Sequence, residues 1–138
     1  MLETILIVIS ATIVLTLGTL HLVYTFHGDK LLPRDRELQT RMEQTFPVIT
    51  RQTTMWRAWI GFNASHSFGA ILFGAIYGYL ALAHPAILFG SPFLAILGGV
   101  TLLGYLVLAK RYFFRIPLRG ILLALIAYGG AFAARLVS

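Results

Sequence analysis

Hydrophobic side chains fill four long stretches of this chain, and nearly all charged side chains lie between them. Each stretch is close to the roughly 20 apolar residues that a helix needs to cross the hydrocarbon core of a bilayer. The first stretch is too long for the core of a signal peptide and has no basic residue before it, so we expect it to be retained. The predicted spans are, in chain order, about residues 3–27, 55–82, 92–109 and 117–137.

Residues that commonly begin or end helices stand at the expected edges of these spans. Thr53 and Thr54 offer hydroxyl oxygens that can cap the second span, and Ser91 does the same for the third. Pro92 suits the first position of a helix, whereas Pro85 is expected to end the second span. Pro117 precedes the fourth span.

One hydrophilic segment, residues 28–55, separates the first two spans. Within it, Leu38, Met42 and Phe46 recur every four residues among basic and acidic side chains. This spacing predicts a short amphipathic helix at about 34–46, lying in the headgroup plane. A plain solvated connector is the alternative.

Composition supports a membrane protein and excludes several kinds of chemistry. Hydrophobic residues make up 58% of the chain, charged residues only 12%, and the mean hydropathy is +0.82, outside the range of soluble globular proteins. We therefore predict an all-α fold, an integral membrane bundle of four transmembrane helices forming a single domain over residues 1–138. Without cysteine the chain has no disulfide, thiolate metal site, iron–sulfur cluster or thiol nucleophile, so a metal or haem would have to use histidine.

The basic residues are distributed very unevenly over the predicted loops. Only one of the eleven lies on the side of the termini, and the other ten lie in the segment up to the start of the second span or between the third and fourth spans. They are Lys30, Arg34, Arg36, Arg41, Arg51, Arg57, Lys110, Arg111, Arg115 and Arg119, against Arg135 alone. The positive-inside rule then places both loops in the cytoplasm and both termini outside it. The net charge of +6 is explained by this topology and by anionic headgroups, and we expect no nucleic-acid partner.

Polar residues inside the first two spans are the candidate functional residues. Ionisable groups at membrane depth are costly, so they indicate function by default. At 1.5 Å per residue, the histidines of the two spans fall at similar depths in the cytoplasmic half of the membrane. We therefore predict one polar pocket, holding two neutral imidazoles and the head of a ligand, with no metal. Its residues are His21, Tyr24, Trp59, Asn63, His66 and Ser67. The alternative is that His21 bonds Asn63 or Ser67 only to join two helices.

Two further expectations concern packing and small polar residues. Small residues in four-residue steps suggest that the second span is the buried helix of the bundle, with Gly69 and Gly74 at helix contacts. Hydroxyls in the first span, such as that of Ser10, are expected to bond back to the preceding turn. All five acidic residues are expected outside the spans, including Glu3.

The runs GTLHLVYTF, LLPRD and TRQTTMWRAWIGFNASHSFGA resemble those of an uncharacterised family of small four-span bacterial membrane proteins. This resemblance implies a multi-pass protein of the bacterial cytoplasmic membrane and no particular activity. In topology alone, the chain is similar to the membrane-bound glutathione-transferase and eicosanoid enzymes, with which it shares a basic region, KRYFFRIPLRG. It departs from their pattern because Arg57 and Asn63 are six residues apart and His66 stands near the place of a glutamate.

Three functions fit the sequence. The first is binding of a lipophilic ligand, a quinone or a membrane lipid, through the polar cluster. The second is a non-catalytic helical subunit of a larger membrane complex or homo-oligomer. The third is haem b held between His21 and His66. Catalytic residues are not indicated, since no carboxylate is expected within the membrane to act as a base.

Overall fold

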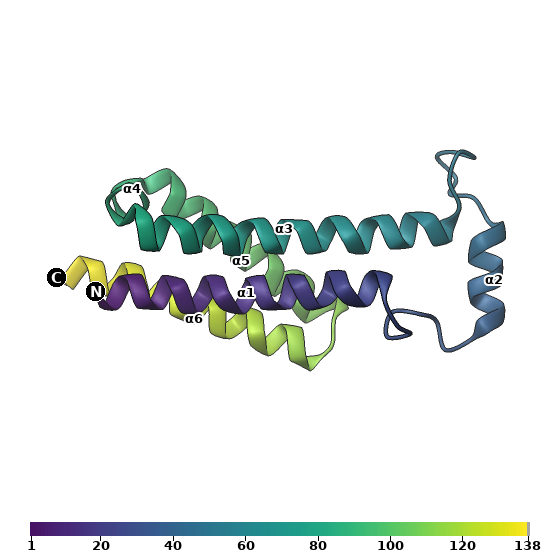
Figure 1. Ribbon diagram of the computed structural model, residues 1–138, viewed down its shortest axis with the longest axis horizontal. Coiled ribbons are helices and arrows are strands. Elements are labelled where there is room, and N and C mark those ends of the chain that lie inside the picture. Colours follow the sequence, from purple (N-terminus) through teal and green to yellow (C-terminus); the bar gives the residue numbers. More distant parts are fainter. Residues whose placement is uncertain (138) are drawn as a thin grey trace. The chain divides into compact units, whose positions relative to one another are not determined.

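The computed structural model describes residues 1–137, and these contain helices and no strand. In chain order the helices are α1 (Leu2–Phe26), α2 (Arg36–Gln44), α3 (Met55–Ala83), α4 (Pro85–Gly90), α5 (Pro92–Tyr112) and α6 (Arg115–Val137) (Figure 1). Helices α1, α3, α5 and α6 are long and apolar enough to cross a membrane. The all-helical class is therefore confirmed, together with four helices of the length and apolarity that a membrane span needs, and α4 is a short helix that the pattern did not indicate.

The helix ends follow the predicted capping chemistry. Thr54 Oγ1 accepts a hydrogen bond of 3.3 Å from the backbone N–H of Arg57 at the start of α3. Ser91 Oγ accepts one of 3.3 Å from Leu94 N–H, and Pro92 occupies the first position of α5. Helix α6 begins two residues earlier than predicted, because Pro117 lies in its first turn, where a missing N–H costs nothing.

Glu3 does not lie outside the spans as expected. It sits in the first turn of α1, where its carboxylate is close to Arg135 near the end of α6. An acidic side chain in a first turn is stabilised by the partial positive charge of the helix N-terminus. The beginning of α1 and the end of α6 therefore meet.

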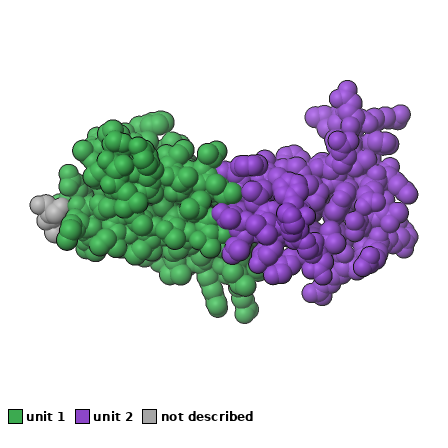
Figure 2. Space-filling model, in the orientation of Figure 1, with its two compact units in different colours: residues 1–17, 70–138 green, residues 18–69 purple. Residues whose placement is uncertain are grey.

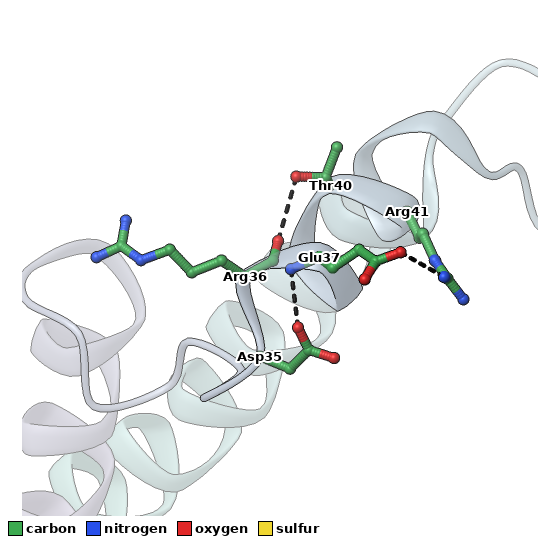
Figure 3. Close-up of polar contacts among 5 residues, drawn as sticks. All are labelled: Asp35, Arg36, Glu37, Thr40 and Arg41. Carbon is green, nitrogen blue, oxygen red and sulfur yellow. Dashed lines mark hydrogen bonds and ion pairs between the residues drawn. The ribbon is translucent and has the colours of Figure 1, made fainter.

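Helix α2 is held by local hydrogen bonds and an ion pair, which polar side chains of the helix and of its N-cap make with the backbone and with one another (Figure 3). Asp35 Oδ1 accepts from Glu37 N–H at 2.9 Å as the N-cap, and Thr40 Oγ1 donates to the carbonyl oxygen of Arg36 at 3.1 Å. Arg41 forms an ion pair with Glu37 one turn earlier. No residue of α2 is buried, and the side chain of Leu38 remains 47% exposed.

The chain divides into two compact units, residues 1–17 with 70–138, and residues 18–69 (Figure 2). We refer to them as unit 1 and unit 2. Both α1 and α3 contribute to each unit, so the division does not follow the order of the sequence. A single domain remains our prediction for the chain.

Unit 1 contains a hydrophobic core to which five helices contribute. Its buried residues include Ile7 and Val14 of α1, Phe73 of α3, Leu88 of α4 and Leu102 of α5, together with α6 residues such as Ala124 and Ala131. Each is less than 9% exposed. Burial against protein on this scale indicates that unit 1 is held by close helix packing.

The small residues of α3 behave differently along its length. A Cβ atom at Gly74 would lie 2.7 Å from the carbonyl oxygen of Ala11 and 2.6 Å from Leu15 Cβ, so α1 and α3 approach closely there. Gly69 is exposed, and Gly61 has no neighbour within 4 Å of such a Cβ. The prediction is thus confirmed at Gly74 and wrong at Gly69. Five residues separate the two, which places them roughly 140° apart around the helix, on different faces.

Two tyrosines bind the backbone of α5 within unit 1. Tyr77 Oη donates to the carbonyl oxygen of Leu94 at 2.7 Å, and Tyr128 Oη donates to that of Ala95 at 2.9 Å. The rings meet edge to face with centroids 5.8 Å apart. Both lie directly over Gly98, where a Cβ would come within 2.8 Å of Tyr77 Cε1 and 2.7 Å of Tyr128 Cζ.

Ser10 departs from the expected back-bonding. Its side chain is fully buried in unit 1, and its Oγ has no hydrogen-bond partner. The expectation that this hydroxyl bonds to the preceding turn is therefore wrong. An unpaired buried hydroxyl costs about 1–3 kcal/mol, and the small volume of serine is what suits it to this closely packed face of α1.

The contact at Gly98 gives a test of this packing. Gly98→Ala should lower the free energy of unfolding by about 1–3 kcal/mol, because the new methyl group overlaps two rings that are fixed by their hydroxyls. Gly104→Ala, in the same helix but with open space around it, should be neutral or stabilising by up to about 1 kcal/mol through helix propensity. Thermal melting of both variants in detergent measures the difference, and equal melting temperatures would contradict the contact.

Candidate functional site

Three of the predicted site residues meet in unit 2. His21 Nε2 of α1 lies 2.9 Å from Asn63 Oδ1 of α3. The imidazole of His66, one turn further along α3, meets the His21 ring edge to face, with centroids 5.5 Å apart and planes at 85°. The structure therefore brings His21, Asn63 and His66 into direct contact, as their spacing predicted.

The orientation of the Asn63 amide is fixed by the backbone. Its Nδ2 donates to the carbonyl oxygen of Trp59 at 2.8 Å, and a carbonyl can only accept. Oδ1 must then face His21, and an amide oxygen is also only an acceptor. His21 Nε2 is therefore the donor. In a neutral His21 ring, Nδ1 carries the lone pair and can accept a hydrogen bond.

In each of the two helices, a hydroxyl side chain donates a hydrogen bond to the backbone carbonyl of a cluster residue. Thr25 Oγ1 donates to the carbonyl oxygen of His21 at 2.8 Å, and Ser67 Oγ donates to that of Asn63 at 2.9 Å. Ser67 is fully buried, so its place is inside unit 2. Thr25 was not among the predicted site residues, although the matching four-residue spacings, 21 to 25 and 63 to 67, could have indicated it.

Tyr24 and Trp59 contact the segment that follows α1. The Lys30 Nζ lies 4.2 Å from the centre of the Tyr24 ring, a cation–π contact. Trp59 Nε1 donates to the carbonyl oxygen of Leu31 at 3.3 Å, and its side chain is 43% exposed. These two aromatic residues thus hold the segment after α1, which belongs to unit 2 as they do.

The geometry does not fit haem b between His21 and His66. An axial imidazole coordinates iron through a nitrogen that has a free lone pair, and because Nε2 of His21 donates to Asn63, only Nδ1 of this ring could coordinate iron. Two rings in edge contact also leave no space for a planar macrocycle between them. Within residues 1–137, no three His, Asp or Glu side chains gather where they could hold a metal ion.

The cluster is accessible from outside unit 2. His21, Asn63 and His66 are each partly exposed, and Phe62 beside them on α3 is 75% exposed. A shallow cavity of about 250 Å³ on the same helix is lined by Ala58, Gly61, Phe62 and Ser65, not by the histidines. The polar atoms therefore form a half-buried patch on α3 and α1, two of the helices that are long and apolar enough to cross a membrane.

Comparison of the chain with protein-family models, curated proteins and solved structures gives no match. The chemistry of the cluster itself indicates what it can bind. The cluster offers an acceptor on Nδ1 when the His21 ring is neutral, one further imidazole and exposed aromatic surface, an arrangement that can bind a polar group.

The His21–Asn63 contact can be measured with a double-mutant cycle. The single variants His21→Ala and Asn63→Ala should each lower stability, and their effects should be non-additive by about 0.5–2 kcal/mol, the range for hydrogen bonds between membrane helices. Unfolding of all four proteins in mixed detergent gives the coupling energy. A cycle of His21→Ala with Gly104→Ala, at a site in unit 1, should give a coupling near zero.

Proposed function

We propose that this protein is a multi-pass protein of the bacterial cytoplasmic membrane that binds the polar head of a lipophilic ligand, a quinone or a lipid, at His21, Asn63 and His66. The observation that carries the proposal is the fixed direction of the His21–Asn63 hydrogen bond. It makes His21 Nε2 a donor and, in a neutral ring, leaves Nδ1 as an acceptor. A hydroxyl, as in a reduced quinone or a lipid glycerol, is the group that such an acceptor binds.

Apolar surface near the cluster suits the rest of such a ligand. Phe62 and Phe68 of α3 are 75% and 56% exposed, and Val23 of α1 is 46% exposed. Pockets for lipophilic molecules combine apolar walls with a few placed polar groups. We infer that the head of the ligand meets the imidazoles while its chain lies along these side chains.

The same proposal places the four spanning helices in one bundle and α2 at the membrane surface. Leu38 of α2 and Phe46, two residues after its end, each expose nearly half of their side chain, whereas Arg34, two residues before its start, and Arg41 are exposed and basic. A helix with this pattern gains free energy when its apolar side enters the headgroup region and its basic side faces phosphate. Helix α2 would then lie in the plane of the cytoplasmic leaflet.

The topology follows from charge and has a direct test. We expect both termini outside the cytoplasm and residues 28–55 inside it, because ten of the eleven basic residues lie in the two connections assigned to the cytoplasm or in the helix ends next to them. An alkaline phosphatase fused after α6 should be active, and the same enzyme inserted after α2 should be inactive. The orientation would be overturned if the fusion after α6 were inactive and the one after α2 active, and if green fluorescent protein fused at the C-terminus were fluorescent.

Ligand binding is tested by mass and visible absorption spectra of protein purified in mild detergent. The wild type should retain a quinone or a lipid in stoichiometric amount. His66→Ala should lose it by tenfold or more while its circular dichroism and melting remain close to wild type. His84→Ala, which removes a histidine that bonds Tyr79 outside the cluster, should retain the ligand. A haem spectrum, or equal retention by both variants, would contradict the proposal.

The second candidate is a non-catalytic helical subunit of a larger complex or a homo-oligomer. The observation in its favour is the shallow cavity on α3 lined by Ala58, Gly61, Phe62 and Ser65, since small residues let another helix approach closely. Here the histidine cluster would only fix the contact of α1 with α3. If the protein is such a subunit, Gly61→Leu should abolish co-purification of a partner and leave the ligand content unchanged. If it only binds a ligand at His66, Gly61→Leu need not change co-purification.

A further inference from the structure

The imidazole of His21 has one ring nitrogen engaged and one without a partner. Nε2 donates to Asn63 Oδ1 at 2.9 Å, whereas no hydrogen bond among residues 1–137 involves Nδ1. Within the same residues, Ser10 Oγ is the only buried side-chain nitrogen or oxygen atom that lacks a partner. His21 is partly exposed, so its unpartnered Nδ1 lies at the accessible surface of unit 2.

The polar side chains next to this imidazole use donor groups on carbonyl oxygens of the protein. Asn63 Nδ2 donates to the carbonyl oxygen of Trp59 at 2.8 Å. Thr25 Oγ1 donates to that of His21 at 2.8 Å, and Ser67 Oγ donates to that of Asn63 at 2.9 Å. What the His21 ring offers to a ligand, when it is neutral, is therefore an acceptor, the lone pair of Nδ1.

We propose that the site at His21 binds a donor hydroxyl of a lipophilic head and thereby selects the reduced form of a quinone over the oxidised form. This inference rests on the proposed function, in which His21 meets the head of the ligand, and it adds the chemical class of that head. A quinol hydroxyl donates to the Nδ1 lone pair. An oxidised quinone has only carbonyl oxygens at the same positions, and these accept hydrogen bonds and cannot donate them.

An oxidised head is disfavoured for a second reason. A carbonyl oxygen that needs a donor finds Nε2 of His21 already bonded to Asn63 Oδ1. If it faced Nδ1 instead, two acceptors would meet, and an acceptor that leaves its partners without gaining a new one costs free energy. Occupancy of the site should then follow how far the quinones of the membrane are reduced, and this requires no electron transfer by the protein.

The hydroxyl of a diacylglycerol carries the same chemistry, so the test uses two matched pairs of ligands in phosphatidylcholine nanodiscs. Decylubiquinol has hydroxyls where decylubiquinone has carbonyls, and dioleoylglycerol has a hydroxyl where its acetate ester has none. In competition read by native mass spectrometry, the quinol should be enriched about three- to tenfold over the quinone, the ratio expected for one hydrogen bond. Retention of dioleoylglycerol without retention of the quinol would assign the hydroxyl to a lipid and overturn the selection of a quinol.

Asn63→Asp should reverse the preference, which a purely structural role of the cluster does not predict. A carboxylate beside His21 stabilises the doubly protonated ring, in which Nδ1 donates and suits a carbonyl. The quinone should then be enriched about three- to tenfold over the quinol. Ser65→Asp places a carboxylate at an exposed position of α3, two residues and about 200° around the helix from Asn63, and should keep the wild-type preference.

Because Asn63→Asp can fail to fold, the His21 ring is also measured in the wild type. Nitrogen NMR of histidine-labelled protein should show Nε2 protonated and Nδ1 unprotonated, with the His21 signals assigned by their loss in His21→Gln. A protonated Nδ1 in the wild type, or equal binding of quinol and quinone, would overturn the inference. Equal binding that His66→Ala abolishes would leave the proposed function standing, whereas a wild type that retains no ligand would overturn both.

Discussion

Hydrocarbon provides no hydrogen-bond partner to a peptide group, and this constraint determines most of what the chain does. Four long helices satisfy their backbone groups internally, and the residues that interrupt helices gather at the ends of these segments, as Pro85 and Pro92 do. The same constraint makes every polar side chain within a span significant. Most of those described here bond to a backbone carbonyl of their own helix or of a neighbouring one, as Thr101 and Tyr77 do.

The two units use different interactions. Unit 1 depends on close approach, with Gly74 against Ala11 and Gly98 under two aromatic rings, and on a core made mostly of apolar side chains. Unit 2 depends on directed hydrogen bonds, among which the bond from His21 to Asn63 joins α1 to α3. Helix α3 has 29 residues, about 43 Å at 1.5 Å per residue, and so exceeds a hydrocarbon core of about 30 Å. In the proposed topology its first turns, with Trp56 and Trp59, would extend into the headgroup region, where aromatic residues are commonly found.

Much of this architecture could be predicted because it depends on local chemistry. Length and apolarity gave the four spans, and Thr54 and Ser91 marked helix starts that the structure confirms. The meeting of His21 with Asn63 was predictable from depth, since rise per residue is constant. Contacts that depend on how far a helix is rotated about its own axis could not be predicted in this way. Gly69 and Gly74 look alike in the sequence, but which of them faces α1 depends on the packing of the whole unit.

The candidate site shows the same limit. Spacing could place six side chains near one another, but not which atom each would bond. Trp59 was expected beside the imidazoles and instead contributes its carbonyl to Asn63 and its indole N–H to Leu31. Ser10 was expected to bond its own helix and instead remains unpaired in the core. These outcomes depend on rotamers, which respond to neighbours far away in the sequence.

The two tyrosines over Gly98 have a consequence for how α5 is positioned along its neighbours. Their acceptors, the carbonyl oxygens of Leu94 and Ala95, are backbone groups that every residue carries, so hydrogen bonding alone does not select this pair. The selection comes from the absent side chain. If α5 slid by one turn, about 5.4 Å, Leu94 or Leu102 would stand beneath the rings and prevent them from reaching the backbone. The position of α5 along its neighbours therefore depends on Gly98, which has no side chain to hold the two rings away from the backbone.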